Sequence, residues 1–492
     1  MAKNAIVIGA GIGGLAAASL LATKGRDVTL FEKNDRPGGK MQQWESSGFQ
    51  FDTGPSLLTM PFQLKKLFEE CGKDINDYLS LIEPDPLCRY FYKDGVVFDN
   101  FADPDKTVEQ IRQFAPKDAE AYRSFLYHSE DLYNKTAEAF LFNPLNDLSD
   151  LKKLKWADVL SINAFSTVSK KVDQFFSSPH LRKFFKRFTT YNGSSPYQAP
   201  ATLNVIPHVE LNQGGYYVKG GLYEIAKSLE KLALSMGVSI EYNQNVTSIL
   251  SDHRRVKAVQ INGEKRINTD LIVANSDASE TILHLLSSTA ISNGKRRRQQ
   301  NLEPSCSGFV LLLGCDKKWD QLKHHNIFFS DNYKKEFSQI FQDNVLPDDP
   351  TIYVANTSVS DPDHAPEGGS NLFVLVNAPY LAKNQDWDHR KKTYRDHIIN
   401  ELEARGLDGL RSAIKTKNII TPLDFYKKYG SNKGSIYGTS SNSIFSAFLR
   451  PRNKLREFEN LYLVGGSTHP GGGIPLVIQS AFNAMQILER QD

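Results

Sequence analysis

Short apolar runs that end in glycine, each followed by a helical stretch, stand at both ends of the chain. Residues 4–9 (NAIVIG) are such a run, and residues 12–23 are rich in alanine and leucine without proline, which favours a helix. Residues 27–31 form a second apolar run. Near the other end, residues 461–464 and a glycine-rich turn precede a helix that begins at Ile474-Pro475. This alternation predicts an α/β fold with a Rossmann-like sheet.

The middle of the chain has a different pattern, with charged and aromatic residues and little glycine over residues 103–190. Within it, Leu181, Phe184, Phe185 and Phe188 recur at helical spacing, with lysine and arginine between them. This pattern predicts a basic amphipathic helix. One interpretation is that its phenylalanine face packs on the core of a domain. The other is that it contacts a membrane surface or a lipid substrate.

Three apolar runs lie within residues 303–450: CSGFVLLLGCD, TIYVANTSV and NLFVLVNAPY. A helix predicted for residues 387–405 separates them from a loop-rich stretch at residues 422–450. We expect these runs to form an antiparallel or mixed sheet in a second domain.

The first forty residues contain a dinucleotide-binding pattern. Gly9, Gly11 and Gly14 form G-x-G-x-x-G between the first predicted strand and helix, and Glu32 closes the next strand. The first glycine permits a tight turn, the second lets the backbone approach a pyrophosphate, and the third lets the helix pack on the strand. Glu32 is placed to bind the ribose hydroxyls. A glycine turn without a ligand is the alternative, but the order strand, helix, strand, acid favours a cofactor.

Further glycines indicate a long cofactor. Gly38, Gly39 and Lys40 follow Glu32 in a loop, where a nicotinamide dehydrogenase usually continues into its next helix. A second close approach of backbone to ligand suits a cofactor whose ring system reaches deeper into the protein. Residues 471–473 are three glycines at the start of the last helix. The positive end of that helix can face a flavin ring.

Composition narrows the class of protein. The chain has 492 residues, which is enough for two or more domains, and is 40% hydrophobic. Its net charge of +3 gives no electrostatic argument for nucleic acid. The four cysteines show no metal-binding spacing and are typical of reduced thiols in a cytosolic protein. No apolar run approaches the ~18 residues of a membrane-spanning helix. A strand that begins at residue 4 leaves no room for a signal peptide.

Taken together, the glycine-rich segments at the two ends of the chain make it resemble the bacterial phytoene desaturase family. Its members are FAD-dependent oxidoreductases of carotenoid biosynthesis within the amine oxidase superfamily. The segments that carry the resemblance are VIGAGIGGLAAA, FEKNDRPGGKM, FDTGPSLLTMP, YYVKGGLYEIAKSLEKLA and LYLVGGSTHPGGGIP. The resemblance implies an FAD-binding domain made of residues 1–100, 205–285 and 455–492. It implies a substrate-binding domain, inserted and of mixed α+β type, made of residues 101–204 and 286–454. The FAD contacts that it implies are Gly9, Gly11, Gly14, Glu32, Gly39, Lys40, Val246, Gly465, Gly466, Gly473, Ile474 and Pro475.

The family contains desaturases and oxidases of terminal methyl groups. LKHHNIFFS, VLPDDPTIYVANTSVSD and NKGSIYG resemble the oxidase branch, the 4,4'-diaponeurosporene oxygenases, whereas FLRPRNK resembles the desaturases. The resemblance therefore implies oxidation of the terminal methyl group of an acyclic C30 carotenoid. Desaturation by hydride transfer to FAD is the alternative, and another enzyme of the flavin amine oxidase fold is a further one. A lipid-binding protein of this fold without catalysis is disfavoured, because Glu32 and the flavin-facing glycines are present.

Catalytic side chains are not evident in the sequence. A carotenoid has no acidic proton and no polar handle, so the flavin carries the hard step while the protein supplies a dry tunnel and orientation. His469, in the glycine-rich turn, is the candidate to follow, although a role in capping that turn is the simpler interpretation. His324 and His325 are weaker candidates, since neighbouring side chains of a strand point apart and a structural role is expected. No metal site is expected.

The resemblance also suggests where the protein works. We expect a cytoplasmic protein with a hydrophobic carotenoid as substrate. Because such a substrate resides in the bilayer, a peripheral contact with the inner face of the cell membrane is expected as well.

Overall fold

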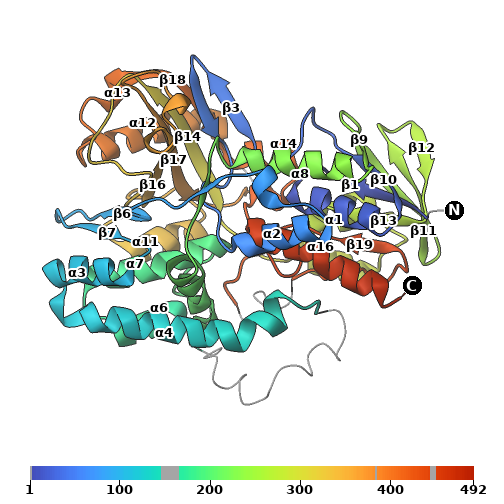
Figure 1. Ribbon diagram of the computed structural model, residues 1–492, viewed down its shortest axis with the longest axis horizontal. Coiled ribbons are helices and arrows are strands. Elements are labelled where there is room, and N and C mark those ends of the chain that lie inside the picture. Colours follow the sequence, from blue (N-terminus) through green and yellow to red (C-terminus); the bar gives the residue numbers. More distant parts are fainter. Residues whose placement is uncertain (1–2, 146–165, 383–384, 444–449, 492) are drawn as a thin grey trace.

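The computed structural model describes residues 3–145, 166–382, 385–443 and 450–491. It is built on a five-stranded parallel sheet in the order β19-β13-β1-β2-β9. These strands are β1 (Asn4–Ile8), β2 (Asp27–Phe31), β9 (Ser239–Glu241), β13 (Leu271–Ala274) and β19 (Leu461–Leu463). Figure 1 shows this sheet on the right, with both chain ends beside it. The predicted α/β fold with a Rossmann-like sheet is confirmed.

The central strand β1 is apolar at nearly every position because both faces of the sheet are covered. Ala5 and Val7 pack with the helices of one face, whereas Ile6 and Ile8 pack with a small antiparallel sheet on the other. The helices are α1 (Ile12–Thr23), α2 (Pro61–Glu70), α8 (Tyr223–Ser235) and α16 (Ile474–Glu489). The small sheet is β10 (Val246–Asp252), β11 (Arg255–Ile261) and β12 (Lys265–Asn268).

A seven-stranded sheet organises the other half of the molecule, in the order β18-β14-β17-β16-β15-β6-β7. All of its pairings are antiparallel except β15 with β6, so the prediction of a mixed or antiparallel sheet is confirmed. Its strands are β6 (Cys88–Phe91), β7 (Val97–Asn100), β14 (Ser307–Cys315), β15 (His325–Phe328), β16 (Ile352–Asn356), β17 (Ser370–Ala378) and β18 (Ile414–Ile420). The helices α12 (Trp387–Glu403) and α13 (Leu410–Ala413) cover one face.

Strands β6 and β7 show that the two halves share the N-terminal hundred residues. Both lie within residues 1–100, which the expected division gives to the cofactor domain, yet they pair into the seven-stranded sheet. Residues 88–100 therefore belong structurally with the second half of the molecule.

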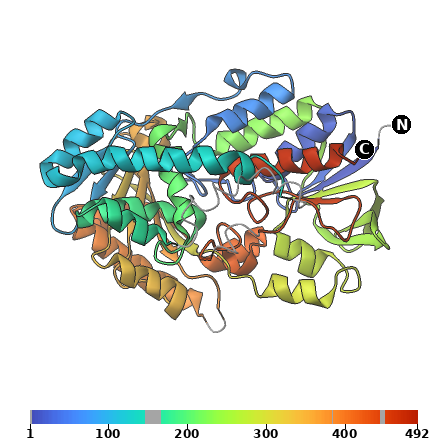
Figure 2. The same cartoon turned by 90° about the horizontal axis from the view of Figure 1, so that it is seen from below.

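A helical lobe completes that half. Its helices are α3 (Pro104–Phe114), α4 (Ala119–Thr136), α6 (Val168–Phe175), α7 (Pro179–Lys186) and α11 (Tyr333–Ser338). Figure 2 shows α4 running from this lobe toward the five-stranded sheet. Two small two-stranded sheets lie outside the large ones: the hairpin of β3 (Gln43–Ser46) and β4 (Phe49–Asp52), and the antiparallel pair of β5 (Leu81–Ile82) with β8 (Tyr217–Val218), whose strands are far apart in the sequence. Further helices are α9 (Ala278–Glu280), α10 (Asn293–Gln300) and α14 (Pro422–Tyr429).

Helix α7 corresponds to the basic amphipathic helix of the sequence. Its apolar residues Leu181, Phe184 and Phe185, and the following Phe188, are fully buried in the aromatic core of the lobe. The interpretation of this face as a membrane surface is therefore wrong, and the alternative of core packing is confirmed. Hydrophobic periodicity cannot distinguish the two, because a core and a bilayer select the same spacing.

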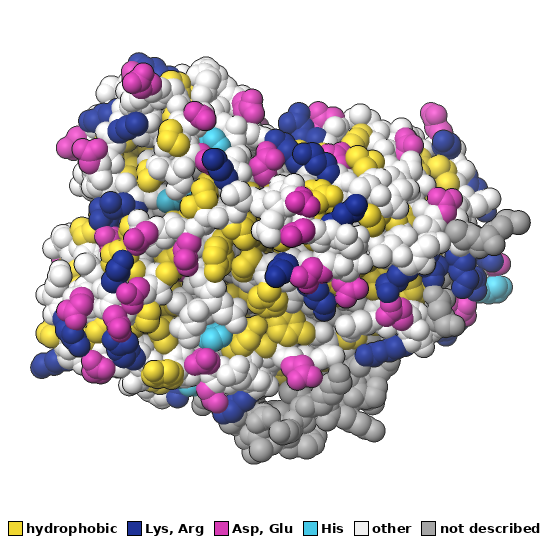
Figure 3. All heavy atoms as spheres, in the orientation of Figure 1, with side chains coloured by type: hydrophobic (Ala, Val, Ile, Leu, Met, Phe, Trp, Pro, Cys, Tyr) yellow, Lys and Arg dark blue, Asp and Glu magenta, His cyan; other side chains and the backbone are white. Residues whose placement is uncertain are grey.

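The surface is chemically mixed. On the face shown in Figure 3, Lys and Arg are interspersed with Asp and Glu, and hydrophobic side chains gather near its centre. The four cysteines, Cys71, Cys88, Cys306 and Cys315, are buried and form no disulfide.

Candidate functional site

A cavity of about 590 Å³ lies between the five-stranded sheet and the seven-stranded sheet. One end is lined by backbone-rich segments at the carboxyl ends of β1, β2, β13 and β19, where an open α/β sheet binds its ligands. The other end is lined by side chains from α4, the helical lobe and β14, β16 and β17. Its apolar lining comprises Phe140, Leu141, Leu203, Val205, Ile206, Val209, Val310, Phe373 and Leu375.

The first glycine turn is shaped for close contact with a ligand. Gly9 has a positive φ of +95°. A Cβ on Gly14 would lie 2.0 Å from the carbonyl oxygen of Gly9, so Gly14 must be glycine for α1 to pack there. Gly14 itself does not line the cavity. Gly11 does line it and is bridged to Gly38 of the second glycine loop. Gly11 is also the N-cap of α1, whose first turn receives no side-chain cap. Its amides and the positive helix end therefore fit a pyrophosphate.

Glu32 lies at the end of β2, buried but facing the cavity. One carboxylate oxygen accepts a hydrogen bond from the Ala10 amide (2.7 Å), and the other accepts bonds from the amide (2.9 Å) and side chain of Asn34. These bonds fix the carboxylate at the cavity wall, which Val246, the first residue of β10, also lines. The position is the one expected for a ribose-binding acid.

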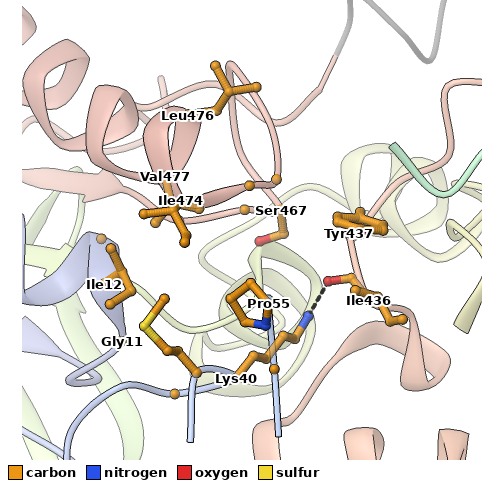
Figure 4. A pocket seen from close by; sticks show the side chains of 18 of the residues that line it. Gly11, Ile12, Lys40, Pro55, Ile436, Tyr437, Ser467, Ile474, Leu476 and Val477 are labelled. Carbon is orange, nitrogen blue, oxygen red and sulfur yellow. Dashed lines mark hydrogen bonds between the residues drawn. The ribbon is translucent and has the colours of Figure 1, made fainter. Parts of the chain in front are cut away.

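Lys40 extends across the cavity floor. Its ammonium donates to the carbonyl oxygens of Ile436 (2.7 Å) and Ser435 (3.2 Å). Figure 4 shows the side chain passing Pro55 to reach Ile436. Burial lowers the pKa of Lys40 to about 8, although Asp277 opposes this. Ile12, Ile474 and Val477 lie across the pocket. A flat ring system can thus lie between a polar floor and an apolar cover.

The C-terminal glycine turn closes this end of the cavity. Gly465, Gly466, Gly473, Ile474 and Pro475 all line it, as do Gly39 and Lys40 from the N-terminal segment. Gly473 has φ +98°, and a Cβ there would meet no atom within 4 Å, so the turn leaves open space in front of α16. Pro475 stands in the first turn of that helix, as the sequence predicts. The two ends of the chain therefore meet at one site.

Two residues of this site were not identified from the sequence. Asn275 follows β13 and places its side chain among the glycine turns, with its Nδ2 3.4 Å from the Gly9 carbonyl oxygen. Its place after an apolar strand beside β1 is the signal that could have found it. Arg450 is buried at the cavity and donates to the carbonyl oxygen of Tyr437 (3.1 Å), and burial lowers its pKa to about 10. It lies in FLRPRNK, the segment that resembles the desaturases, but nothing in that segment marks it as a cavity residue.

The three candidate histidines differ in their surroundings. His469 lines the cavity, but its Nε2 donates to the Asn143 carbonyl oxygen (2.9 Å) and its amide donates to Pro451, so it fixes the turn. A catalytic role for it stays a prediction. His324 and His325 do not point apart, because their ring centroids are only 4.4 Å from each other. The reason is that β15 begins at His325, so His324 lies outside the regular strand.

Comparison with known proteins places the chain in a family. The sequence model of the flavin containing amine oxidoreductases matches residues 12–487. The chain is 37% identical to a 4,4'-diapolycopene oxygenase of Methylomonas sp over 97% of its length and 96% of the relative. It is 36% identical to a 4,4'-diaponeurosporene oxygenase of Staphylococcus haemolyticus over 97% of its length and 95% of the relative. Among solved structures, an oxidoreductase from Methanosarcina mazei superposes with a TM-score of 0.67 at 16% identity, covering 98% of this chain and 100% of that one.

The fold, the two-ended glycine site and these matches agree with the resemblance inferred from the sequence, and the cofactor is FAD. The chain belongs to the flavin containing amine oxidoreductase family and is an FAD-dependent oxidoreductase.

Proposed function

We propose that this enzyme oxidises the terminal methyl group of an acyclic C30 carotenoid. The observation that carries the proposal is that one cavity joins the cofactor-shaped end to an apolar end. An extended hydrocarbon fits the apolar end, and its terminus would reach the cofactor end. The names of the two relatives, both carotenoid oxygenases at 36–37% identity, support the same substrate class.

The residues present fit FAD. We propose that Gly9, Gly11 and the amides of α1 hold the pyrophosphate, with Gly14 allowing α1 to pack. We assign Glu32 to the ribose and Val246 to the adenine side. The flavin end would lie among the remaining residues of the set: Gly39, Lys40, Gly465, Gly466, Gly473, Ile474 and Pro475. When bound, FAD supplies the acceptor for the electrons that leave the substrate.

The residues of the chain bind the substrate, orient it and exclude water from its reacting end. The apolar wall receives the polyene by hydrophobic burial, about 25 cal/mol per Å² of apolar surface removed from water. Val310, Phe373 and Leu375 form part of this wall and exclude water from the reacting end. The positive N-terminal end of α16 and the Lys40 ammonium both lie at the cofactor end of the cavity, where they would stabilise negative charge on the bound cofactor.

Replacement of Glu32 by alanine should weaken FAD binding by about tenfold or more, because a buried acceptor of ribose hydrogen bonds is lost. The measurement is the flavin absorbance per protein after purification and after dialysis. Glu241→Ala, which removes an exposed carboxylate from the neighbouring strand β9, is the matched control and should keep full occupancy. Equal flavin content in both variants would contradict the role of Glu32.

Desaturation remains the second candidate, favoured by the FLRPRNK segment whose Arg450 reaches the cavity. The experiment that separates the two is product mass after co-expression with enzymes that supply 4,4'-diaponeurosporene in one strain and 4,4'-diapophytoene in another. Oxygen gained on diaponeurosporene, with diapophytoene unchanged, is the expected result. Loss of hydrogen pairs from diapophytoene without oxygen would identify a desaturase. No change in either would refute both candidates for C30 substrates.

We also propose a peripheral contact with the inner face of the cell membrane, supported by the hydrophobic chemistry of the proposed substrate. Over the residues that the structure covers, no helix combines the length and apolarity needed to cross a bilayer.

A further inference from the structure

A row of polar groups interrupts the apolar wall of the cavity next to the cofactor end. The Ser56 hydroxyl lies 2.6 Å from the Tyr353 hydroxyl, which lies 2.7 Å from Nδ1 of His325. Ser56 and Tyr353 both line the cavity. Ser56 directly follows Pro55, which Figure 4 shows beside Lys40. The row therefore begins where the cofactor end meets the substrate end.

The row continues behind the wall into a fully buried histidine pair. His325 is 3% exposed, and in the part of the chain that the structure describes its Nε2 has no hydrogen-bond partner. His324 lies against it, with its own Nδ1 bonded to Ser360 (2.6 Å). Burial lowers the pKa of His324 to about 4 and that of His325 well below its usual value, with the charge of Arg187 adding to the effect on His325. Both rings are therefore neutral at physiological pH.

The row is the polar part of a wall that Val310, Phe373 and Leu375 otherwise make apolar. Its hydroxyls bond one another and His325, and each keeps a hydrogen-bonding site that only a polar partner inside the cavity can fill. A hydrocarbon offers no such partner. An oxidised end group does, because an alcohol donates a hydrogen bond and an aldehyde accepts one.

We propose that Ser56 and Tyr353, held in place by His325, form a subsite for the oxygen atom of a partly oxidised carotenoid end group. The inference rests on the proposed function and adds how a second oxidation can follow the first at the same carbon. Conversion of the alcohol to the aldehyde removes two hydrogens and two electrons, which FAD would accept when bound. The subsite would hold the alcohol with its carbinol carbon toward the cofactor end while this happens.

The row can bind both the alcohol and the aldehyde, because the donor direction of its hydrogen bonds can reverse. If Ser56 donates to Tyr353 and Tyr353 donates to His325, the hydroxyl oxygens keep lone pairs that accept a bond from an alcohol. If Nδ1 of His325 donates to Tyr353 instead, the Ser56 proton is left to bond the oxygen of an aldehyde. His325 acts here as a positioning residue rather than as a base, because protonation of a buried ring beside Arg187 is unfavourable.

The test compares holoenzyme variants for the ratio of alcohol to aldehyde formed from 4,4'-diaponeurosporene. Tyr353→Phe and Ser56→Ala should each raise that ratio by about tenfold, because each removes one hydrogen bond from the intermediate. They should also raise KM for the supplied alcohol more than they lower kcat. Tyr394→Phe is the matched control, since it removes a buried hydroxyl, bonded to the Pro347 carbonyl oxygen, away from this cavity. It should leave the ratio unchanged.

A substitution of His325 tests the positioning role. His325→Leu should raise the ratio although this residue does not line the cavity, and His325→Gln, whose amide can still pair with the phenol, should restore it in large part. If neither Tyr353→Phe nor Ser56→Ala changes the ratio, the subsite is wrong while the proposed function stands. If the wild-type enzyme forms no oxygenated product, the proposed function itself fails.

Binding to the wild-type protein gives a readout that does not depend on turnover or on the folding of variants. A hydrogen bond to the carbonyl of a conjugated aldehyde shifts its absorption to longer wavelength. The C30 aldehyde should therefore show a larger shift on binding than diaponeurosporene does. Equal shifts for the two ligands would overturn the subsite.

Discussion

Gly11→Val should yield a colourless protein, with FAD affinity lowered by at least about a hundredfold, or about 2.7 kcal/mol. Gly11 lines the cavity at the N-terminus of α1, so a branched side chain there occupies the space in which the pyrophosphate approaches the helix amides. The fold should tolerate the change. The atom closest to an added Cβ, at 2.6 Å, is Nδ2 of the Asn275 side chain, which can rotate away.

The measurement is flavin absorbance of the purified protein, followed by titration of the apoprotein with FAD. Gly294→Val is the matched control, because a Cβ on that helical glycine of α10 would meet no atom within 4 Å. It should purify with full flavin content. A yellow Gly11→Val protein that binds FAD as tightly as the control would show that the first glycine turn is not the pyrophosphate site.

The second large effect is expected on stability, at an ion pair beneath the substrate end of the cavity. Arg187 donates to the carboxylate of Glu210 and to the Tyr90 hydroxyl (2.6 Å), while the Tyr191 hydroxyl donates to the other oxygen of Glu210. Both charged side chains are buried. Burial lowers the pKa of Arg187, but the Glu210 carboxylate together with Tyr90, Tyr191 and Cys88 outweighs this effect and raises the pKa well above its usual value.

Arg187→Met should therefore lower the free energy of unfolding by about 3–5 kcal/mol, because it leaves the Glu210 carboxylate buried without its cation. That is a large part of the roughly 5–15 kcal/mol by which folded proteins are stable. Thermal unfolding of the holoenzyme measures the effect. The double variant Arg187→Met, Glu210→Met should recover most of the loss, because it leaves no unpaired charge. If the single variant is as stable as the wild type, the pair contributes nothing.

Local patterns in the sequence were sufficient to predict the main elements of the cofactor half of the molecule. A strand over residues 4–9, a helix over residues 12–23 and the last helix from Ile474 were predicted, because glycine spacing and apolar runs act over a few residues. The structure has these elements at Asn4–Ile8, Ile12–Thr23 and Ile474–Glu489. All the residues assigned to FAD by resemblance line the cavity except Gly14, whose task is packing. Their contacts with the cofactor stay a prediction.

Features that depend on distant pairing could not be predicted. Strand β6 joins the seven-stranded sheet by pairing with β15, more than 200 residues later, so residues 88–100 appeared to belong to the cofactor domain. Ser56 meets Tyr353 across 297 positions, and no spacing in the sequence relates them. The sequence could not decide whether Phe184 on α7 is buried in the protein, because an amphipathic pattern does not show whether a protein core or a membrane covers the apolar face of a helix.

The most direct test of the central claim is a crystal structure of the holoenzyme with 4,4'-diaponeurosporene. We expect the adenosine end of FAD at Glu32, its ring system between Lys40 and the start of α16, and the polyene along the wall of Leu203, Ile206 and Val209, with one terminal carbon near Tyr353. A carotenoid bound elsewhere, or one whose central double bonds rather than its end lie beside the flavin, would contradict oxidation of the terminal methyl group in this cavity.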